Sequence, residues 1–166
     1  HGFEVKYFLN ATLAELRACF HELQEEGTAE DARLLVYFAG HGLNQYVSDG
    51  QKGFLIPADA VRGDTTSYLA MQELMEVLES IKSRHLLLVL DCCFAGSIKW
   101  SGTYQRDIGF ENVQKIFRQY FDIYTRYKAR QVLTSASHRQ KALDRYEDAD
   151  QHSPFAQCLI NALQGA

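Results

Sequence analysis

Short runs of apolar residues alternate along the chain with segments whose apolar residues recur every three or four positions. The clearest run is Leu86 to Leu90, five consecutive aliphatic residues without a polar face. Such a run is typical of a strand buried on both sides, as in a parallel sheet covered by helices. Residues 32–38 and 131–134 also contain apolar runs that predict strands. The pattern predicts an α/β fold with a mainly parallel sheet flanked by helices.

The helical segments are expected between these strands. Thr12 is predicted to cap the first helix, Glu15 completes a capping box, and Gly27 ends the helix. Ser153 is predicted to cap the last helix, with Pro154 at its first position. Apolar residues at helical spacing predict two more helices, over 69–83 and over 110–124.

Three other segments lack this pattern. Residues Phe3 to Leu9 alternate apolar and charged side chains and predict a strand near a sheet edge. The run Gly53 to Asp59 contains Pro57 and predicts a small edge strand or hairpin. The polar run 138–152 predicts a mobile loop that could act as a lid.

Size and charge narrow the class of protein. With 166 residues, of which 46% are hydrophobic, the chain can bury one core and is expected to be a single domain. The net charge of −4 argues against nucleic-acid binding. No apolar run has the length of a membrane span and nothing resembles a secretion signal, so a cytoplasmic protein without membrane contacts is expected.

The four cysteines do not suggest a disulfide framework in a chain of this length. No C-x-x-C pair suggests zinc, and no metal site is predicted. Cys19 and Cys158 lie on predicted helices and are expected to be small buried hydrophobic residues. Cys92 and Cys93 are adjacent, and their side chains should point in different directions.

Candidate chemistry follows two of the predicted strands. Asp91, Cys92 and Cys93 come directly after the run ending at Leu90, and His41 lies between two glycines after the strand 32–38. In open parallel sheets, catalytic groups collect at the carboxyl ends of the strands. A thiol and an imidazole at one sheet edge are the parts of a cysteine nucleophile and its base.

The segments Y-F-A-G-H-G (37–42) and L-D-C-C-F-A-G (90–96) resemble the two catalytic motifs of the caspase-like cysteine peptidases, closest to the metacaspase and prokaryotic caspase-like branch. The motifs of that family typically read Y-S-G-H-G and D-S-C-H-S-G. Two later segments, V-L-T-S-A-S (132–137) and H-S-P-F-A-Q-C-L-I-N-A-L (152–163), also resemble the family, in its order. Phe94 and Ala95 depart from the usual His and Ser, which affects subsite details more than the dyad.

The resemblance implies a caspase-hemoglobinase fold and a cysteine endopeptidase. His41 and Cys93 would be the catalytic dyad, and the backbone N–H groups of Gly42 and Cys93 would form the oxyanion hole. Asp91 would line the pocket for the residue before the cleaved bond and would select Arg or Lys. Ser135 and Ser137, at the same sheet edge, are further candidates for substrate binding.

Several alternatives stay open. Cys92 would be the nucleophile if the register were shifted by one residue. Asp91 could merely accept hydrogen bonds from backbone N–H groups in its turn. The domain could be a catalytically silent caspase-like scaffold, or another thiol acyl-transfer enzyme such as a transpeptidase or deamidase.

The resemblance also concerns parts outside the chain. The family fold usually opens with a strand and helix before the segment that matches residues 2–5, and it has further elements after the last helix. We therefore expect a portion of a longer protein, with regulatory domains or subunits elsewhere. No cofactor is expected, but metacaspases can depend on calcium, and the acids of 138–152 could bind it. The segment 98–130 could include a self-cleavage site.

Overall fold

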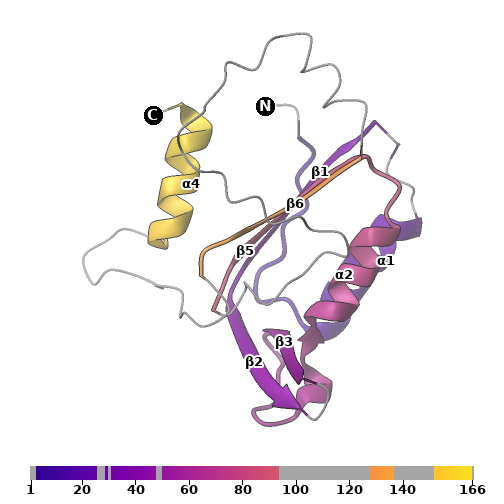
Figure 1. Ribbon diagram of the computed structural model, residues 1–166, viewed down its shortest axis with the longest axis vertical. Coiled ribbons are helices and arrows are strands. Elements are labelled where there is room, and N and C mark those ends of the chain that lie inside the picture. The colour runs from indigo at the N-terminus through magenta and orange to yellow at the C-terminus, as the bar shows by residue number, and fades with distance from the viewer. Residues whose placement is uncertain are drawn as a thin grey trace.

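The computed structural model describes residues 3–25, 29, 31–47, 50–93, 128–136 and 152–165 (Figure 1). The helices and strands in chain order are α1 (Leu13–Glu25), β1 (Arg33–Ala39), β2 (His41–Val47), β3 (Gly50–Ile56), β4 (Leu69–Ala70), α2 (Met71–Ser80), β5 (His85–Asp91), β6 (Ala129–Thr134) and α4 (Pro154–Gln164). Within these residues the strands form two sheets, ordered β1-β5-β6 and β2-β3-β4.

The sheet β1-β5-β6, called the parallel sheet below, has β5 as its middle strand. Strand β5 pairs in parallel with β1 from Arg33↔His85 to Ala39↔Asp91, and with β6 from His85↔Ala129 to Leu90↔Thr134. Leu88, Val89 and Leu90 are fully buried. The uninterrupted aliphatic run therefore became the middle strand of this sheet, as the sequence predicted, and its side chains are buried on both faces, Leu88 and Leu90 on one and Val89 on the other.

The second sheet is antiparallel. Strands β2 and β3 pair from His41↔Ile56 to Val47↔Gly50, and β4 adds to β3 at Leu69 and Ala70. Pro57 follows β3 directly, where the absence of an N–H group ends the pairing. Of the two alternatives predicted for Gly53 to Asp59, the hairpin is confirmed, whereas the edge strand is wrong because β3 lies between β2 and β4. The expected loop around His41 is shorter than predicted, because β2 begins at His41 and only Gly40 separates it from β1.

Both predicted helix caps are confirmed. The backbone N–H of Thr12 donates to Glu15 Oε2 over 2.8 Å, and the N–H of Glu15 donates back to Thr12 Oγ1 over 3.2 Å. At α4, Ser153 Oγ accepts from the N–H of Ala156 over 3.0 Å. Gly165 ends α4 with a φ of 83°, a left-handed conformation that costs glycine little.

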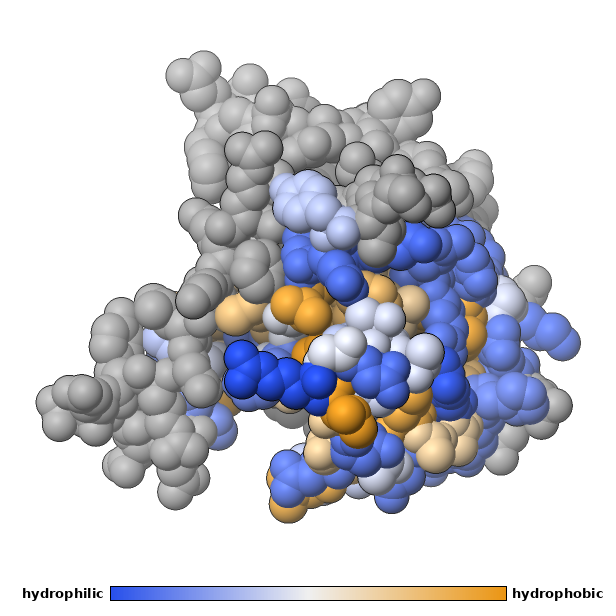
Figure 2. Space-filling model, turned by 90° about the horizontal axis from the view of Figure 1, so that it is seen from below, coloured by the Kyte–Doolittle hydropathy of each residue, from blue (hydrophilic) through white to orange (hydrophobic). Residues whose placement is uncertain are grey.

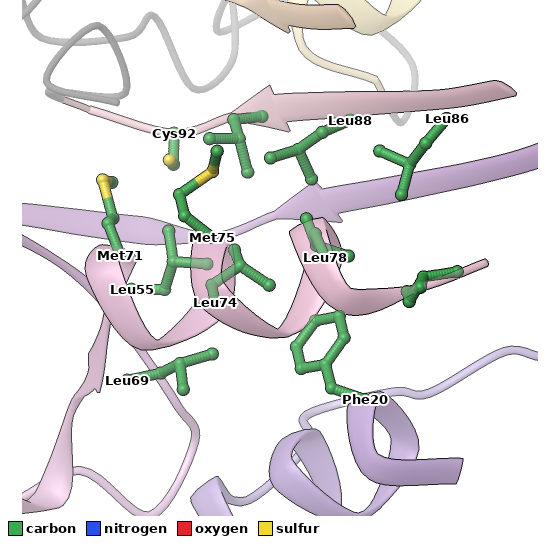
Figure 3. Close-up of a cluster of buried hydrophobic side chains, with 12 residues drawn as sticks. Phe20, Leu55, Leu69, Met71, Leu74, Met75, Leu78, Leu86, Leu88 and Cys92 are labelled. Carbon is green, nitrogen blue, oxygen red and sulfur yellow. The ribbon is translucent and has the colours of Figure 1, made fainter. Parts of the chain in front are cut away.

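Helices α1 and α2 lie together on one face of the parallel sheet (Figure 1). Figure 3 shows α2 between α1 and the strands, with Leu74, Met75 and Leu78 among the side chains that fill the space. Phe20 of α1 points toward this cluster from the other side. The Arg17 guanidinium of α1 donates to both carboxylate oxygens of Glu73 on α2, over 2.6 and 2.9 Å.

The opposite face of the parallel sheet is more open. It carries Leu35, Tyr37 and Leu133, each about two-fifths exposed, and also Asp91. The N-terminus of α4 contacts this face through Ser153. Seen from below, the molecule presents hydrophobic side chains bordered by hydrophilic ones (Figure 2).

Other sequence predictions are wrong. Residues Phe3 to Leu9 are not a strand, because no strand in the described part of the chain pairs with them, and a strand needs a hydrogen-bonded neighbour. Cys158 is exposed on α4 rather than buried, and Cys19 is only partly buried. Gly27, the helix predicted over 110–124 and all of the loop predicted over 138–152 except His152 lie outside the described residues.

Candidate active site

The ends of β1 and β5 bring His41 and Cys93 to one edge of the parallel sheet. Ala39 and Asp91 are the last pair of the β1–β5 register, so His41 and Cys93 each lie two residues beyond it. The N–H of Gly40 donates to the backbone carbonyl of Asp91 over 3.2 Å, which holds the two chain segments together past the last pair. The sequence predicted this meeting of neighbouring strands, and the strand order provides it.

Gly42 lies directly against the backbone of Cys93. A Cβ atom at position 42 would come within 2.2 Å of the Cys93 carbonyl oxygen and 3.2 Å of Cys92 Sγ. The first distance is far below any real contact of a Cβ atom and involves backbone, which cannot move aside cheaply. Only glycine therefore allows the His41–Gly42 and Cys92–Cys93 segments to pack this closely.

The two adjacent cysteines have different surroundings. Cys92 is 1% exposed, and its sulfur points into the hydrophobic cluster beside Met71 and Met75 (Figure 3). Burial, followed by the neighbouring Cys93 and Asp91, raises the pKa of the Cys92 thiol to about 12. Cys93 is only partly buried and His41 is exposed. Of the two thiols, Cys93 is the one that a substrate can reach.

Asp91 is 8% exposed and holds two hydrogen bonds from side chains of other elements. The hydroxyl of Tyr37 on β1 donates to Asp91 Oδ2 over 3.1 Å, and the hydroxyl of Ser153 donates to the same oxygen. The predicted alternative, in which the Asp91 carboxylate binds backbone N–H groups of its own turn, is not seen among the described residues. Instead the carboxylate joins β1, β5 and the start of α4.

Ser135 directly follows β6 and lies level with Asp91 of the neighbouring strand β5. Its N–H donates to the carbonyl of Leu90 over 3.0 Å, just past the pair Leu90↔Thr134. Its Oγ atom is buried and has no hydrogen-bond partner in the described part of the structure. Ser137, the other predicted substrate-binding serine, lies outside the described residues.

The sequence pattern does not predict a role at this site for Tyr37 or Ser153. Tyr37 belongs to an apolar run, and Ser153 is predicted only as a helix cap. The polar end of a tyrosine within an apolar run is the signal that could have found it, since a partly buried hydroxyl usually has a partner. The burial, with the negative charge of Asp91, raises the pKa of Tyr37 to about 12, so the hydroxyl stays a donor at neutral pH.

No group of three or more metal-binding side chains occurs within the described ranges. The acids of 138–151, considered above for calcium, lie outside them. A hollow of about 200 Å³ lies at the opposite end of β1 and β5, lined by Asp31, Arg33, Arg84 and His85. It shares no residue with the candidate site.

Comparison with known proteins adds two findings. The family model described as the caspase domain matches residues 1–166. A protein named "probable protease" from a Desulfuromonadales bacterium is 22% identical over 162 residues, which cover 95% of this chain. The chain spans 18% of the length of that relative. None of the described helices is long and apolar enough to cross a membrane.

Proposed function

Because the chain belongs to the caspase domain family of cysteine peptidases, we propose that it hydrolyses peptide bonds with Cys93 as nucleophile and His41 as general base, and that it cleaves after Arg or Lys. The observation that carries this proposal is the meeting of the two segments beyond the Ala39↔Asp91 pair, with Gly42 against Cys93. A reachable thiol and an exposed imidazole at one sheet edge can perform acyl transfer.

In the first half of the reaction, the Cys93 sulfur attacks the carbonyl carbon of the substrate while His41 takes the thiol proton. The negative charge then forms on the carbonyl oxygen, where the N–H groups of Gly42 and Cys93 would donate hydrogen bonds. The C–N bond breaks as His41 returns the proton to the leaving amine. A thioester between Cys93 and the substrate remains.

In the second half, a water molecule attacks the thioester and gives its proton to His41. The C–S bond breaks, the product leaves with a new carboxyl group, and Cys93 recovers its proton from His41. One peptide bond and one water molecule are consumed in each cycle, and the enzyme returns to its starting state.

The burial of Cys92 supports Cys93 over its neighbour. A thiol whose pKa is about 12 is almost never a thiolate at neutral pH, and the thiolate is the reactive form. Cys92 also faces the hydrophobic cluster and not the surface. We therefore assign Cys92 to packing beneath the site.

Asp91 supports the preference for basic side chains. Its carboxylate is buried, and within the described residues it has hydroxyl partners but no cationic one. A substrate Arg or Lys would supply the missing positive charge. An acidic or apolar side chain in the same place would leave that charge unpaired.

The test is a set of fluorogenic peptides that differ only in the residue before the cleaved bond, with Arg, Lys, Asp or Ala there. We expect cleavage after Arg and Lys. Cys93→Ala and His41→Ala should each abolish it, whereas Cys92→Ala should retain most of it and lose about 1 kcal/mol of stability, the order of one buried methylene group. A peptide chloromethyl ketone should label Cys93.

A preference for Asp before the cleaved bond would mean that Asp91 does not line the specificity pocket. Loss of activity in Cys92→Ala, with activity retained in Cys93→Ala, would reverse the assignment of the nucleophile. If the chloromethyl ketone labels neither thiol and no peptide is cleaved, the domain is a silent scaffold. Transfer of the acyl group to an added amine, in place of hydrolysis, would indicate a transpeptidase.

A further inference from the structure

The hydrogen bonds of the Asp91 carboxylate are unequally divided between its two oxygens. Tyr37 and Ser153 both donate to Oδ2. A carboxylate oxygen has two lone pairs, so two donors fill the capacity of Oδ2. Among the described residues, no donor reaches Oδ1.

The two donors come from different directions and from well-anchored positions. Tyr37 belongs to β1 and reaches Asp91 along the face of the sheet, since Tyr37↔Val89 and Ala39↔Asp91 are successive pairs on that face. Ser153 is the N-cap of α4, and its oxygen at the same time accepts from the N–H of Ala156 over 3.0 Å. The carboxylate is therefore held from two sides and cannot easily rotate.

A second polar group without a partner lies on the neighbouring strand, one residue past the Leu90↔Thr134 pair and therefore level with Asp91. The hydroxyl oxygen of Ser135 is buried without a partner in the described structure, on the strand next to Asp91 and in the same row. A buried polar group without a partner is unfavourable unless a ligand satisfies it. A carboxylate oxygen and a hydroxyl oxygen, both able to accept further hydrogen bonds within the described structure, suit a cationic side chain that carries several N–H groups.

We propose that Tyr37 and Ser153 are positioning residues for substrate selection: they occupy Oδ2 of Asp91 and so present only Oδ1, together with the hydroxyl of Ser135, to the basic side chain of the substrate. This inference rests on the function proposed above and adds to it how the pocket distinguishes Arg from Lys. A guanidinium prefers to bind a carboxylate through two parallel hydrogen bonds, one to each oxygen. Because Tyr37 and Ser153 occupy both lone pairs of Oδ2, a guanidinium cannot bind both oxygens of Asp91. Lys should therefore be bound about as well as Arg.

The experiment measures kcat and KM for two peptides that are identical except for Arg or Lys before the cleaved bond. In the unmodified chain, kcat/KM should be nearly equal for the two peptides, because each basic side chain reaches the same single carboxylate oxygen. Tyr37→Phe frees one lone pair of Oδ2. KM should then rise for both peptides because Asp91 is less well held, and it should rise more for Lys, so that Arg becomes preferred by about tenfold. The kcat values should change little, since the dyad is untouched.

Matched variants separate positioning from general damage. Tyr46→Phe makes the same chemical change at a tyrosine that is 79% exposed on β2, and it should leave both KM values as they are. Ser153→Ala should raise the KM values and the Arg to Lys ratio as Tyr37→Phe does. Ser153→Thr should leave both quantities as in the unmodified chain, because threonine keeps the donor and the cap. A purely structural role would not produce a change in the Arg to Lys ratio.

The outcomes are distinct. If the chain cleaves after basic residues but Tyr37→Phe and Ser153→Ala leave KM and the Arg to Lys ratio unchanged, the positioning role is wrong and the proposed function stands. If the unmodified chain already prefers Arg strongly over Lys, the closed arrangement at Oδ2 is wrong. If the chain cleaves after acidic residues only, the proposed specificity itself fails and this inference fails with it.

Discussion

At the scale of single residues, the candidate site depends on two neighbours, Cys92 and Cys93, with different environments. Extended backbone sends successive side chains to opposite sides, so one thiol enters the hydrophobic cluster and the other stays near the surface. The sequence predicted that the two would differ. Which of them was buried depended on the facing helix, because Met71 and Met75 of α2 fill the space beneath Cys92.

Gly42 provides the sharpest prediction at this scale. In Gly42→Ala, the new Cβ atom would collide with the carbonyl oxygen of Cys93, and the His41 and Cys93 segments would have to separate. A displacement of about 1 Å at a catalytic centre can reduce the rate about a hundredfold. We expect a loss of that order in kcat/KM, measured with the basic peptide substrates.

Gly40→Ala is the matched control for that substitution. The nearest atoms to its Cβ would be those of the Phe38 ring, the closest at 3.0 Å, and a side chain can move aside more easily than backbone. The loss of activity should therefore be much smaller than in Gly42→Ala. Equal losses in the two variants would mean that the contact of Gly42 with Cys93 is not what the site requires.

At the scale of elements, the helix termini were the most predictable features. Thr12 with Glu15, and Ser153 with Pro154, mark helix starts by short-range chemistry that the local sequence fully specifies. The strand predicted over Phe3–Leu9 does not form, for the opposite reason. Its alternating pattern suits a strand, but a strand forms only where another strand offers its N–H and C=O groups, and local sequence does not reveal this.

The cap of α1 should make stability depend on pH. Hydrogen bonds, first from the backbone N–H and then from the hydroxyl of Thr12, lower the pKa of Glu15 below its ordinary value of 4.5. A carboxylate whose pKa is lower in the folded state stabilises that state above its ordinary pKa, and the contribution is lost as the pH falls through the folded-state value. Glu15→Gln keeps the acceptor and removes the charge.

We therefore expect Glu15→Gln to reduce the free energy of unfolding near neutral pH and to have a smaller effect as the solution is acidified below pH 4.5. Urea unfolding of both proteins across this range measures the difference. Glu4→Gln, which removes another exposed carboxylate, controls for the change in net charge. The cap explanation fails if the difference between Glu15→Gln and the unmodified chain grows toward acid.

At the scale of the whole molecule, stability should be concentrated in the layer between α1, α2 and the parallel sheet. Leu88 lies in the middle of this layer and is fully buried. Leu88→Ala removes three carbon atoms from a packed interior and should lower the free energy of unfolding by about 2–5 kcal/mol. Leu35→Ala, on the open face of the same sheet at 43% exposure, should cost less than about 1 kcal/mol.

Urea unfolding of these two variants checks the prediction. Similar losses would mean that the open face of the sheet is covered in solution, since an exposed leucine has little burial to lose. The position of the site follows from the same layering. It lies at the carboxyl edge of the sheet, and the described contacts between that edge and α4 include the bond from Ser153 to Asp91.

The sequence by itself determined the elements and the types of chemistry: an aliphatic run must be buried, caps start helices, and a thiol and an imidazole follow two strands. These depend on the properties of neighbouring residues, which the sequence displays directly. Tertiary structure decided which cysteine is buried, why position 42 must be glycine, and which hydroxyl groups hold Asp91. Each of these depends on a contact between residues far apart in the chain, and only the packing of strands and helices creates such contacts.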